Sequence, residues 1–77
     1  KESIKIYTEN NKNVVVSNSD YTKIKEILIV DLLGHVIRVN PTSDSYNVID
    51  MSNYAAGVYT VKAVTDFGSK TEKIVIR

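Results

Sequence analysis

The feature that most constrains the fold of this chain is a period-two alternation of polar and apolar residues in short segments. Successive side chains of a strand point to opposite faces, so this pattern is typical of strands with one buried face. Turn-forming residues interrupt it about every 8–12 residues, which is typical of a sandwich or barrel. The expected strands are Ser3–Thr8, Val14–Val16, Lys25–Asp31, Val36–Val39, Tyr46–Met51, Val58–Thr65 and Lys70–Arg77.

The segments between these strands have the residues that tight turns need. Asparagines in Asn10–Asn13 tolerate the left-handed backbone, and Gly34 supplies a positive φ at no steric cost. Lys25–Asp31 has apolar residues on both faces of a strand, at Ile27–Val30, which predicts a central strand covered on both faces. We therefore expect an all-β, immunoglobulin-like antiparallel β-sandwich of about seven strands with Greek-key connections.

The size and composition of the chain exclude several classes of function. Its 77 residues form one domain at most, with a core too thin for a deep cleft and its supporting shell. A formal net charge of +1 gives no reason to expect nucleic acid as a partner. The chain has no cysteine, so disulfides and thiolate metal sites are excluded. It opens at Lys1 without Met or an apolar export segment, and we expect a fragment of a longer exported protein.

Three side chains, His35, Asp31 and Asp50, are the candidates for catalytic or metal chemistry. His35 is the only histidine, and it follows Gly34 in a tight turn. We interpret it as a solvated turn residue, because no cysteine or second histidine completes a metal site. Each aspartate ends an apolar strand, where a carboxylate accepts hydrogen bonds from the N–H groups of the next turn. Acid/base catalysis would need the three to converge. We expect no cofactor, no metal and no enzymatic activity.

The five tyrosines have two interpretations, a ligand-binding aromatic platform or core packing. Tyr59 is expected in the core with its hydroxyl at the rim, and Tyr46 in the core or at the rim. Tyr54 falls in a loop and is the better candidate for an exposed contact, together with Tyr21. These two are the contacts expected if the chain is a carbohydrate-binding or other immunoglobulin-like binding module, which is the alternative function.

The last expected strand carries three cations, Lys70, Lys73 and Arg77, among apolar residues. They have two interpretations, a surface for an acidic partner or the solvated face of an edge strand, where charge blocks unwanted pairing. An open edge strand also predicts that two copies can pair as a dimer.

Three segments, in order, resemble the C-terminal sorting domains of the type IX (Por) secretion system. Ile29–Ile37 looks like the family's I-Y-D-L-x-G-R-x-V hairpin, and Tyr46–Tyr59 looks like its I-D-L-S-x-L-x-x-G-x-Y stretch. Gly68–Arg77 looks like the terminal K-x-V-x-K/R motif. The resemblance covers roughly residues 25 to 77.

This resemblance implies a sorting signal in an exported protein of a Bacteroidetes-type bacterium. The cargo would be the upstream part of the same chain. The partners would be the outer-membrane secretion machinery and a surface sortase that removes the domain upstream of or near Lys1. The route would lead through the periplasm to the outer membrane and cell surface. The terminal strand would be read by strand addition. The expected recognition residues are Gly57, Tyr59, Lys70, Lys73, Ile74, Val75, Ile76 and Arg77.

Overall fold

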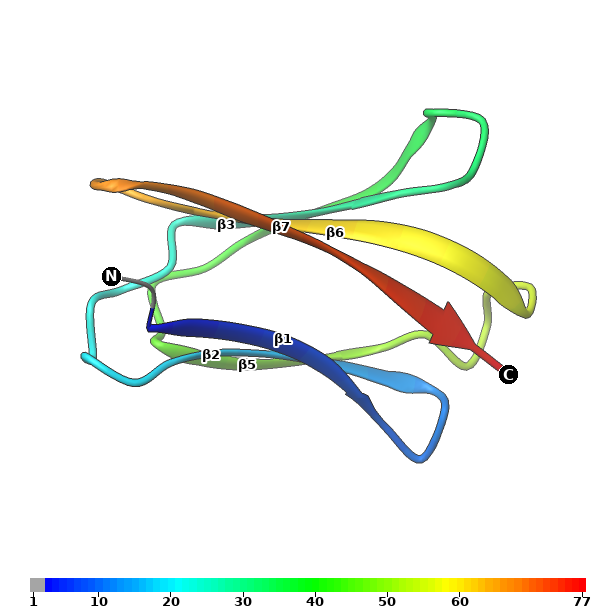
Figure 1. Cartoon of the computed structure of the whole chain (residues 1–77), viewed down its shortest axis with the longest axis horizontal. Coiled ribbons are helices and arrows are strands. Elements are labelled where there is room, and N and C mark those ends of the chain that lie inside the picture. Colours follow the sequence, from blue (N-terminus) through cyan, green and yellow to red (C-terminus); the bar gives the residue numbers. More distant parts are fainter. Residues whose placement is uncertain (1–2) are drawn as a thin grey trace.

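The computed structural model of this chain describes residues 3–77, which form seven strands in two antiparallel sheets (Figure 1). Within this described part, no helix is long and apolar enough to cross a membrane. The strands are β1 (Ile4–Glu9), β2 (Asn13–Asn18), β3 (Glu26–Val30), β4 (Val36–Pro41), β5 (Tyr46–Asp50), β6 (Gly57–Thr65) and β7 (Gly68–Ile76).

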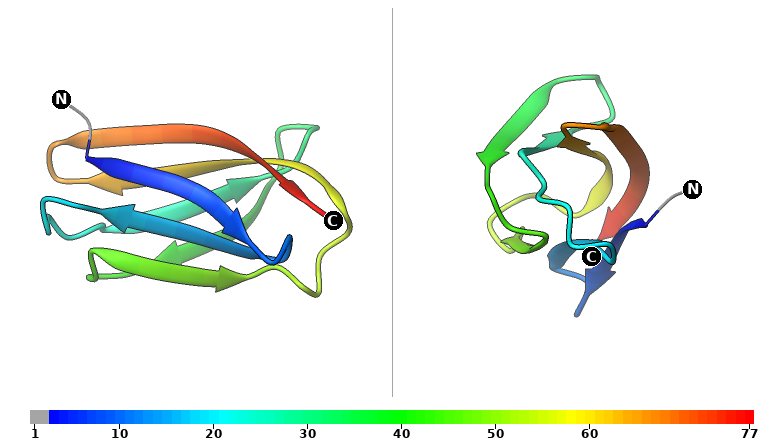
Figure 2. Two further views of the ribbon diagram at one scale, coloured as in Figure 1. Left: turned by 60° about the horizontal axis from the view of Figure 1, so that its bottom comes forward. Right: turned by 90° about the vertical axis from the view of Figure 1, so that its left-hand side faces the viewer.

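The two sheets face each other as a sandwich. One sheet has three strands in the order β1-β2-β5, and the other has four in the order β4-β3-β6-β7. The chain forms hairpins at β1/β2, β3/β4 and β6/β7, and it crosses between the sheets after β2, β4 and β5 (Figure 2). These crossings are the Greek-key connections of an immunoglobulin-like sandwich, so the predicted fold class is confirmed.

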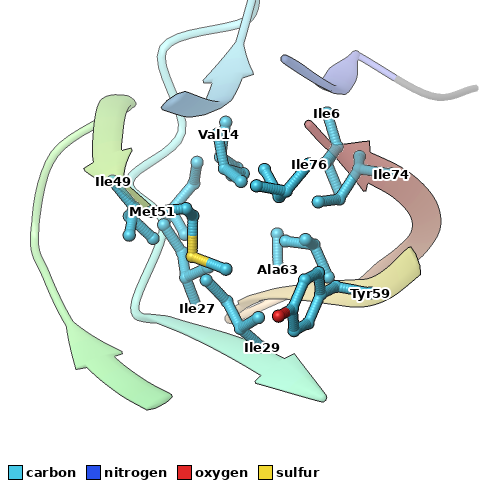
Figure 3. Close-up of a cluster of buried hydrophobic side chains, with 13 residues drawn as sticks. Ile6, Val14, Ile27, Ile29, Ile49, Met51, Tyr59, Ala63, Ile74 and Ile76 are labelled. Carbon is cyan, nitrogen blue, oxygen red and sulfur yellow. The ribbon is translucent and has the colours of Figure 1, made fainter. Parts of the chain in front are cut away.

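The core lies between the sheets and is built from alternate residues of nearly every strand. Ile29 of β3 lies opposite Val61 of β6, and both are fully buried. Ile74 and Ile76 complete this layer from β7, while Val14 and other residues of the three-stranded sheet face them (Figure 3). Fully burying one such aliphatic side chain contributes about 1.5–3 kcal/mol, so the period-two pattern is also the main source of stability.

The segment from Lys25 to Asp31 does not have the two covered faces that its sequence predicts. β3 is central within its sheet, but only Ile27 and Ile29 are fully buried, and Leu28 between them is partly exposed. A two-layer sandwich packs only one face of each sheet against the other, so Leu28 on the outer face of β3 stays in contact with solvent. The prediction of a doubly covered strand was therefore wrong.

A single polar side chain, Asn18, is buried among residues 3–77, and it holds together the end of the sandwich where β1 begins. Its Oδ1 accepts a 2.6 Å hydrogen bond from the Ser3 hydroxyl, and its Nδ2 donates one of 3.1 Å to the Thr22 carbonyl. Because both polar atoms of the carboxamide have partners, its burial carries little penalty. Asn18 thereby fixes the loop between β2 and β3 against the start of β1.

The tight turns adopt the backbone geometry that their sequences predict. Asn10 and Asn11 have φ values of 54° and 58°, and Gly34 has a φ of 87°. The Asn10–Lys12 turn, the β3–β4 turn, the β5–β6 connection and Arg77 lie at one end of the sandwich, which we call the distal pole. The described chain starts with Ser3 at the other end (Figure 1).

Candidate functional site

The exposed side chains of the terminal strand form a short stripe on the outer face of the four-stranded sheet. Lys73 lies opposite Thr60 and Val75 opposite Val58, both on this outer face, and Arg77 continues the alternation. Ile74 and Ile76 point the other way and are buried in the core. The terminal segment therefore presents a cation, a valine and a cation to solvent. We call Lys73, Val75 and Arg77 the terminal stripe.

Lys70 does not belong to this face of the sheet. It lies opposite the buried Ala63, and Glu72 lies opposite the buried Val61, so both project from the inner face of β7. Inward-pointing charges on an edge strand oppose pairing with further strands. Our expectation that the three cations share one solvated face was wrong for Lys70, which is half-buried.

β7 is an edge strand, so one side of its backbone lacks a neighbouring strand in the described structure. Its sole partner in the sheet is β6, and β1 is likewise at the edge of the other sheet. These two edges lie on the same side of the sandwich (Figure 2). Between them is a groove of about 380 Å³, whose lining includes Ile6, Tyr7, Thr8, Lys73, Val75 and Arg77. We call this the β1–β7 groove.

Gly57 and Tyr59 shape the β5–β6 connection. Tyr59 is buried, and its hydroxyl donates a 2.5 Å hydrogen bond to the Ala55 carbonyl four residues upstream. This is the tyrosine-corner arrangement of immunoglobulin-like sandwiches, in which the phenol fixes a crossing between the sheets. The predicted position of Tyr59, in the core with its hydroxyl at the rim, is confirmed. The buried phenol therefore fixes the β5–β6 connection from inside the domain.

The structure also reveals an apolar tip at the distal pole that sequence reasoning missed. Leu32 and Leu33, in the β3–β4 turn, are 73% and 80% exposed. A cavity of about 200 Å³ joins this turn to Ala56–Tyr59 of the β5–β6 connection. Two leucines inside a turn segment that ends in Gly34 are the signal that was available, because apolar residues seldom occupy such turns without contacts.

The order of these segments matches a known family along almost the whole chain. A family model described as the secretion system C-terminal sorting domain matches residues 3–77. The chain belongs to this family. A sorting domain of this kind serves as a type IX C-terminal sorting signal, which implies a cargo chain, secretion machinery, and export toward the outer membrane or cell surface.

Comparison with solved structures supports the fold of the sorting domain. An immunoglobulin-like β-sandwich protein of the DUF3244 family from Bacteroides vulgatus superposes with a TM-score of 0.83. The two share 18% sequence identity over 99% of this chain and 85% of the other, a likeness that shows the fold alone. A comparison with curated proteins found none that matches. Sorting domains and immunoglobulin-like folds are typically non-catalytic.

The acid/base candidates of the sorting domain serve its turns. Asp31 Oδ1 accepts hydrogen bonds of 2.9 Å from the N–H groups of Leu33 and His35. His35 Nδ1 lies 3.3 Å from Asp31 Oδ2, while Asp50 accepts from the Ser52 N–H at 2.8 Å. Their predicted role as turn acceptors is confirmed. Among residues 3–77, no group of three His, Cys, Asp or Glu side chains is arranged to hold a metal ion.

These turn hydrogen bonds predict how the stability of the sorting domain depends on pH. Backbone N–H groups of Thr22, His35 and Ser52 lower the pKa values of Asp20, Asp31 and Asp50, respectively, below 3.8. A carboxylate whose pKa is lower in the folded state than in the unfolded state stabilises the fold. This stabilisation is fully present above the unfolded-state pKa and is lost as pH falls through the folded-state pKa.

We expect the free energy of unfolding to be constant from pH 7 to 5 and to fall steadily below pH 4, because these carboxylates become protonated. Urea denaturation at a series of pH values measures the effect. An Asp31→Asn, Asp50→Asn double variant should show a shallower acid dependence. Equal stability of the parent domain at pH 3 and pH 7 would contradict the prediction.

Tyr21 and Tyr54, the two contacts expected of a carbohydrate-binding module, do not lie together. Tyr21 is 83% exposed in the β2–β3 loop, whereas Tyr54 lies at the distal pole, half-buried against the core. The expected exposure of Tyr54 and the core or rim position of Tyr46 were therefore wrong. Tyr46 is 54% exposed, on the outer face of the three-stranded sheet. Tyr7 lies on the same face, where burial, and after it the neighbouring Tyr46, raise the pKa of Tyr7.

Proposed function

We propose that this domain is a non-catalytic sorting signal whose terminal strand is the segment that the secretion machinery reads. The proposal covers one domain, residues 1–77, at the C-terminal end of a longer exported protein. The terminal stripe and the free edge of β7 supply the recognition surface. Main-chain hydrogen bonds along the edge give affinity, and alternate side chains give specificity.

One observation carries this proposal. β7 is an edge strand that places Lys73 and Val75 on its outer face, and Arg77, which follows its last residue, is also exposed. An open backbone edge and exposed side chains therefore occur on the same segment. β1 starts at the end of the sandwich opposite the C-terminus (Figure 1). A cargo joined before Ser3 would leave the distal pole uncovered. This separation suits a signal that serves cargo proteins of different shapes.

The eight expected recognition residues divide into two roles under this proposal. Lys73, Val75 and Arg77 contact the partner directly, because their side chains are exposed on one face. Tyr59, Ile74 and Ile76 are buried, and they hold β7 and the adjacent loop in place. Gly57 and Lys70, both half-buried, lie beside this surface.

The decisive experiment follows the export of a cargo fused before residue 1. We expect deletion of Ile74–Arg77 to abolish surface delivery, because it removes the last third of the edge strand together with Arg77. That deletion also removes two core isoleucines, so a Lys73→Gln, Arg77→Gln variant that keeps the core is needed. We expect this double variant to fold normally and to reduce export. The proposal is contradicted if both variants deliver cargo as the parent does.

The fate of the domain after export forms the second part of the proposal. We propose that export passes through the periplasm and that a surface sortase then removes the domain upstream of or near Lys1. The support is the family relationship together with the position of Ser3, which starts β1 at an exposed end of the sandwich. Mass spectrometry of surface-delivered cargo tests this, and cargo that retains residues 3–77 would contradict it.

A further inference from the structure

The β1–β7 groove has strands of two different sheets along its sides, and their edges both lack a neighbour in the described structure. Near Lys73 and Arg77 the groove is lined by Ile6, Tyr7 and Thr8. A second cavity, of about 230 Å³, is lined by Ser3 and Ile4 together with residues Gly68–Lys70. The starts of β1 and β7 therefore lie together, as do their ends, so the two strands run parallel.

The β1–β7 groove is closed at the distal pole by a hydrogen bond between the end of the chain and the β1–β2 turn. The Arg77 N–H donates a 3.0 Å hydrogen bond to the carbonyl of Asn11 in the turn after β1. This bond ties the end of β7 to the β1–β2 hairpin. The volume of about 380 Å³ is at the lower end of the range for ligand-binding clefts, roughly 300–1,000 Å³. An extended segment of a few residues is the kind of occupant that fits such a site.

The charged side chains that line this groove are all positive. They are Lys73 and Arg77, and neither forms an ion pair with any residue of the described chain. Residues four apart on a strand face the same way and are separated by roughly 13 Å, at about 3.3 Å per residue. A strand added beside β7 would therefore meet two cations with Val75 midway between them.

We infer that the β1–β7 groove binds an extended acidic segment of a partner protein, with two carboxylates four residues apart and an apolar residue midway. The segment pairs with the free edge of β7 at Lys73 and Val75, where one carboxylate lies beside Lys73 and the apolar residue beside Val75. Its second carboxylate meets only the side chain of Arg77, because the Arg77 N–H is already bonded to Asn11. Directly opposed side chains of neighbouring strands lie about 4.5–5.5 Å apart at Cβ, close enough for each ion pair. The inference rests on the proposed function, because it assigns a chemistry to the partner that reads this edge.

The test uses the intact domain and three labelled heptapeptides of known sequence. The first is Thr-Glu-Thr-Val-Thr-Glu-Thr, which has the required spacing. The second replaces both glutamates with glutamine, and the third, Thr-Glu-Thr-Val-Glu-Thr-Thr, moves one glutamate to the other face of the strand. We expect the first to bind best, by roughly fivefold in fluorescence anisotropy at low salt, since exposed ion pairs each contribute modestly. Raising the salt concentration should reduce this difference.

Variants of the domain locate the binding site. Lys73→Gln with Arg77→Gln should remove the preference for the first peptide. Lys23→Gln with Lys25→Gln makes the same change in net charge outside the groove lining and should preserve the preference. Amide NMR shifts should change at Ile6–Thr8 and at Lys73–Arg77. N-methylation of alternate amides on the pairing edge of the peptide should abolish binding, because it blocks strand addition.

Equal binding of all three peptides, or no detectable binding of any, would overturn the inference. Shifts confined to other surfaces would also overturn it. The export experiment is independent of these results. If export requires Lys73 and Arg77 while the peptides fail, the chemistry assigned to the partner is wrong and the sorting function stands. If export does not depend on the terminal strand, the proposed function is wrong, whether or not the peptides bind.

Discussion

Replacing Tyr59 with alanine is expected to lower the free energy of unfolding by about 3–5 kcal/mol, as truncation of a buried aromatic ring does. The ring fills the core beside Ile74, and its hydroxyl fixes the β5–β6 connection through Ala55. Proteins store about 0.05–0.15 kcal/mol per residue, so a domain of this length has about 4–12 kcal/mol in total. Tyr59→Ala therefore removes a large fraction of the stability. Urea denaturation followed by circular dichroism measures it.

The Tyr59→Phe variant separates the two roles of the side chain. It keeps the ring and removes the hydroxyl, so we expect a loss of about 1 kcal/mol, the usual net contribution of one hydrogen bond. The fold should persist, and export of a fused cargo should continue. If Tyr59→Phe abolished export while remaining folded, the hydroxyl would be read by the machinery directly, contrary to its buried position.

The second large effect is expected from Asn18→Asp, which changes a single buried group. In the parent, Nδ2 donates to the Thr22 carbonyl, whereas an ionised carboxylate would direct an oxygen at that carbonyl. The new charge would also lie near Asp20, whose Oδ2 accepts from the same Ser3 hydroxyl. We expect a loss of about 2–4 kcal/mol at pH 7, because a buried charge without a compensating partner is costly.

The pH dependence of the Asn18→Asp variant tests whether its loss of stability is electrostatic. Burial and the nearby carboxylate raise the pKa of the introduced group in the folded state. The stability difference from the parent should therefore be small well below pH 4, should grow as pH rises from the unfolded-state pKa, about 3.9, to that raised value, and should then stay constant. Asn53→Asp, on the exposed β5–β6 connection, is the matched control and should change stability little at any pH. A pH-independent loss for Asn18→Asp would contradict the electrostatic explanation.

Much of the fold was predictable because strand alternation and turn chemistry are local. Each expected strand overlaps an observed one, and the asparagines of the β1–β2 turn adopt the positive φ values that they were expected to adopt. Which faces of a strand are covered depends on the number of layers, which is a property of the whole fold. For that reason the apolar run from Lys25 to Asp31 was misinterpreted, and so was Tyr46.

The candidate site was predictable only in part, and for a similar reason. The terminal strand and the turn-binding aspartates follow from their neighbours in the sequence. The β1–β7 groove joins residues more than sixty positions apart, such as Thr8 and Lys73, and no local pattern reveals that two edges run side by side. The face of Lys70, by contrast, could have been predicted, because Lys70 and Lys73 are three residues apart on one strand and so point to opposite faces.

The charges on the inner side of β7 have a consequence for how copies of this domain behave when they are crowded. Lys70 and Glu72 project inward from the first part of the strand, where a sheet would otherwise have apolar side chains to bury. Another strand approaching there would have to cover both charges, so unplanned association is disfavoured along that stretch. From Lys73 onward the inner residues are isoleucines already packed in the core. The first part of β7 therefore opposes pairing with another strand, whereas the part from Lys73 onward does not. An incoming strand can then pair in one place only, and this fixes its register.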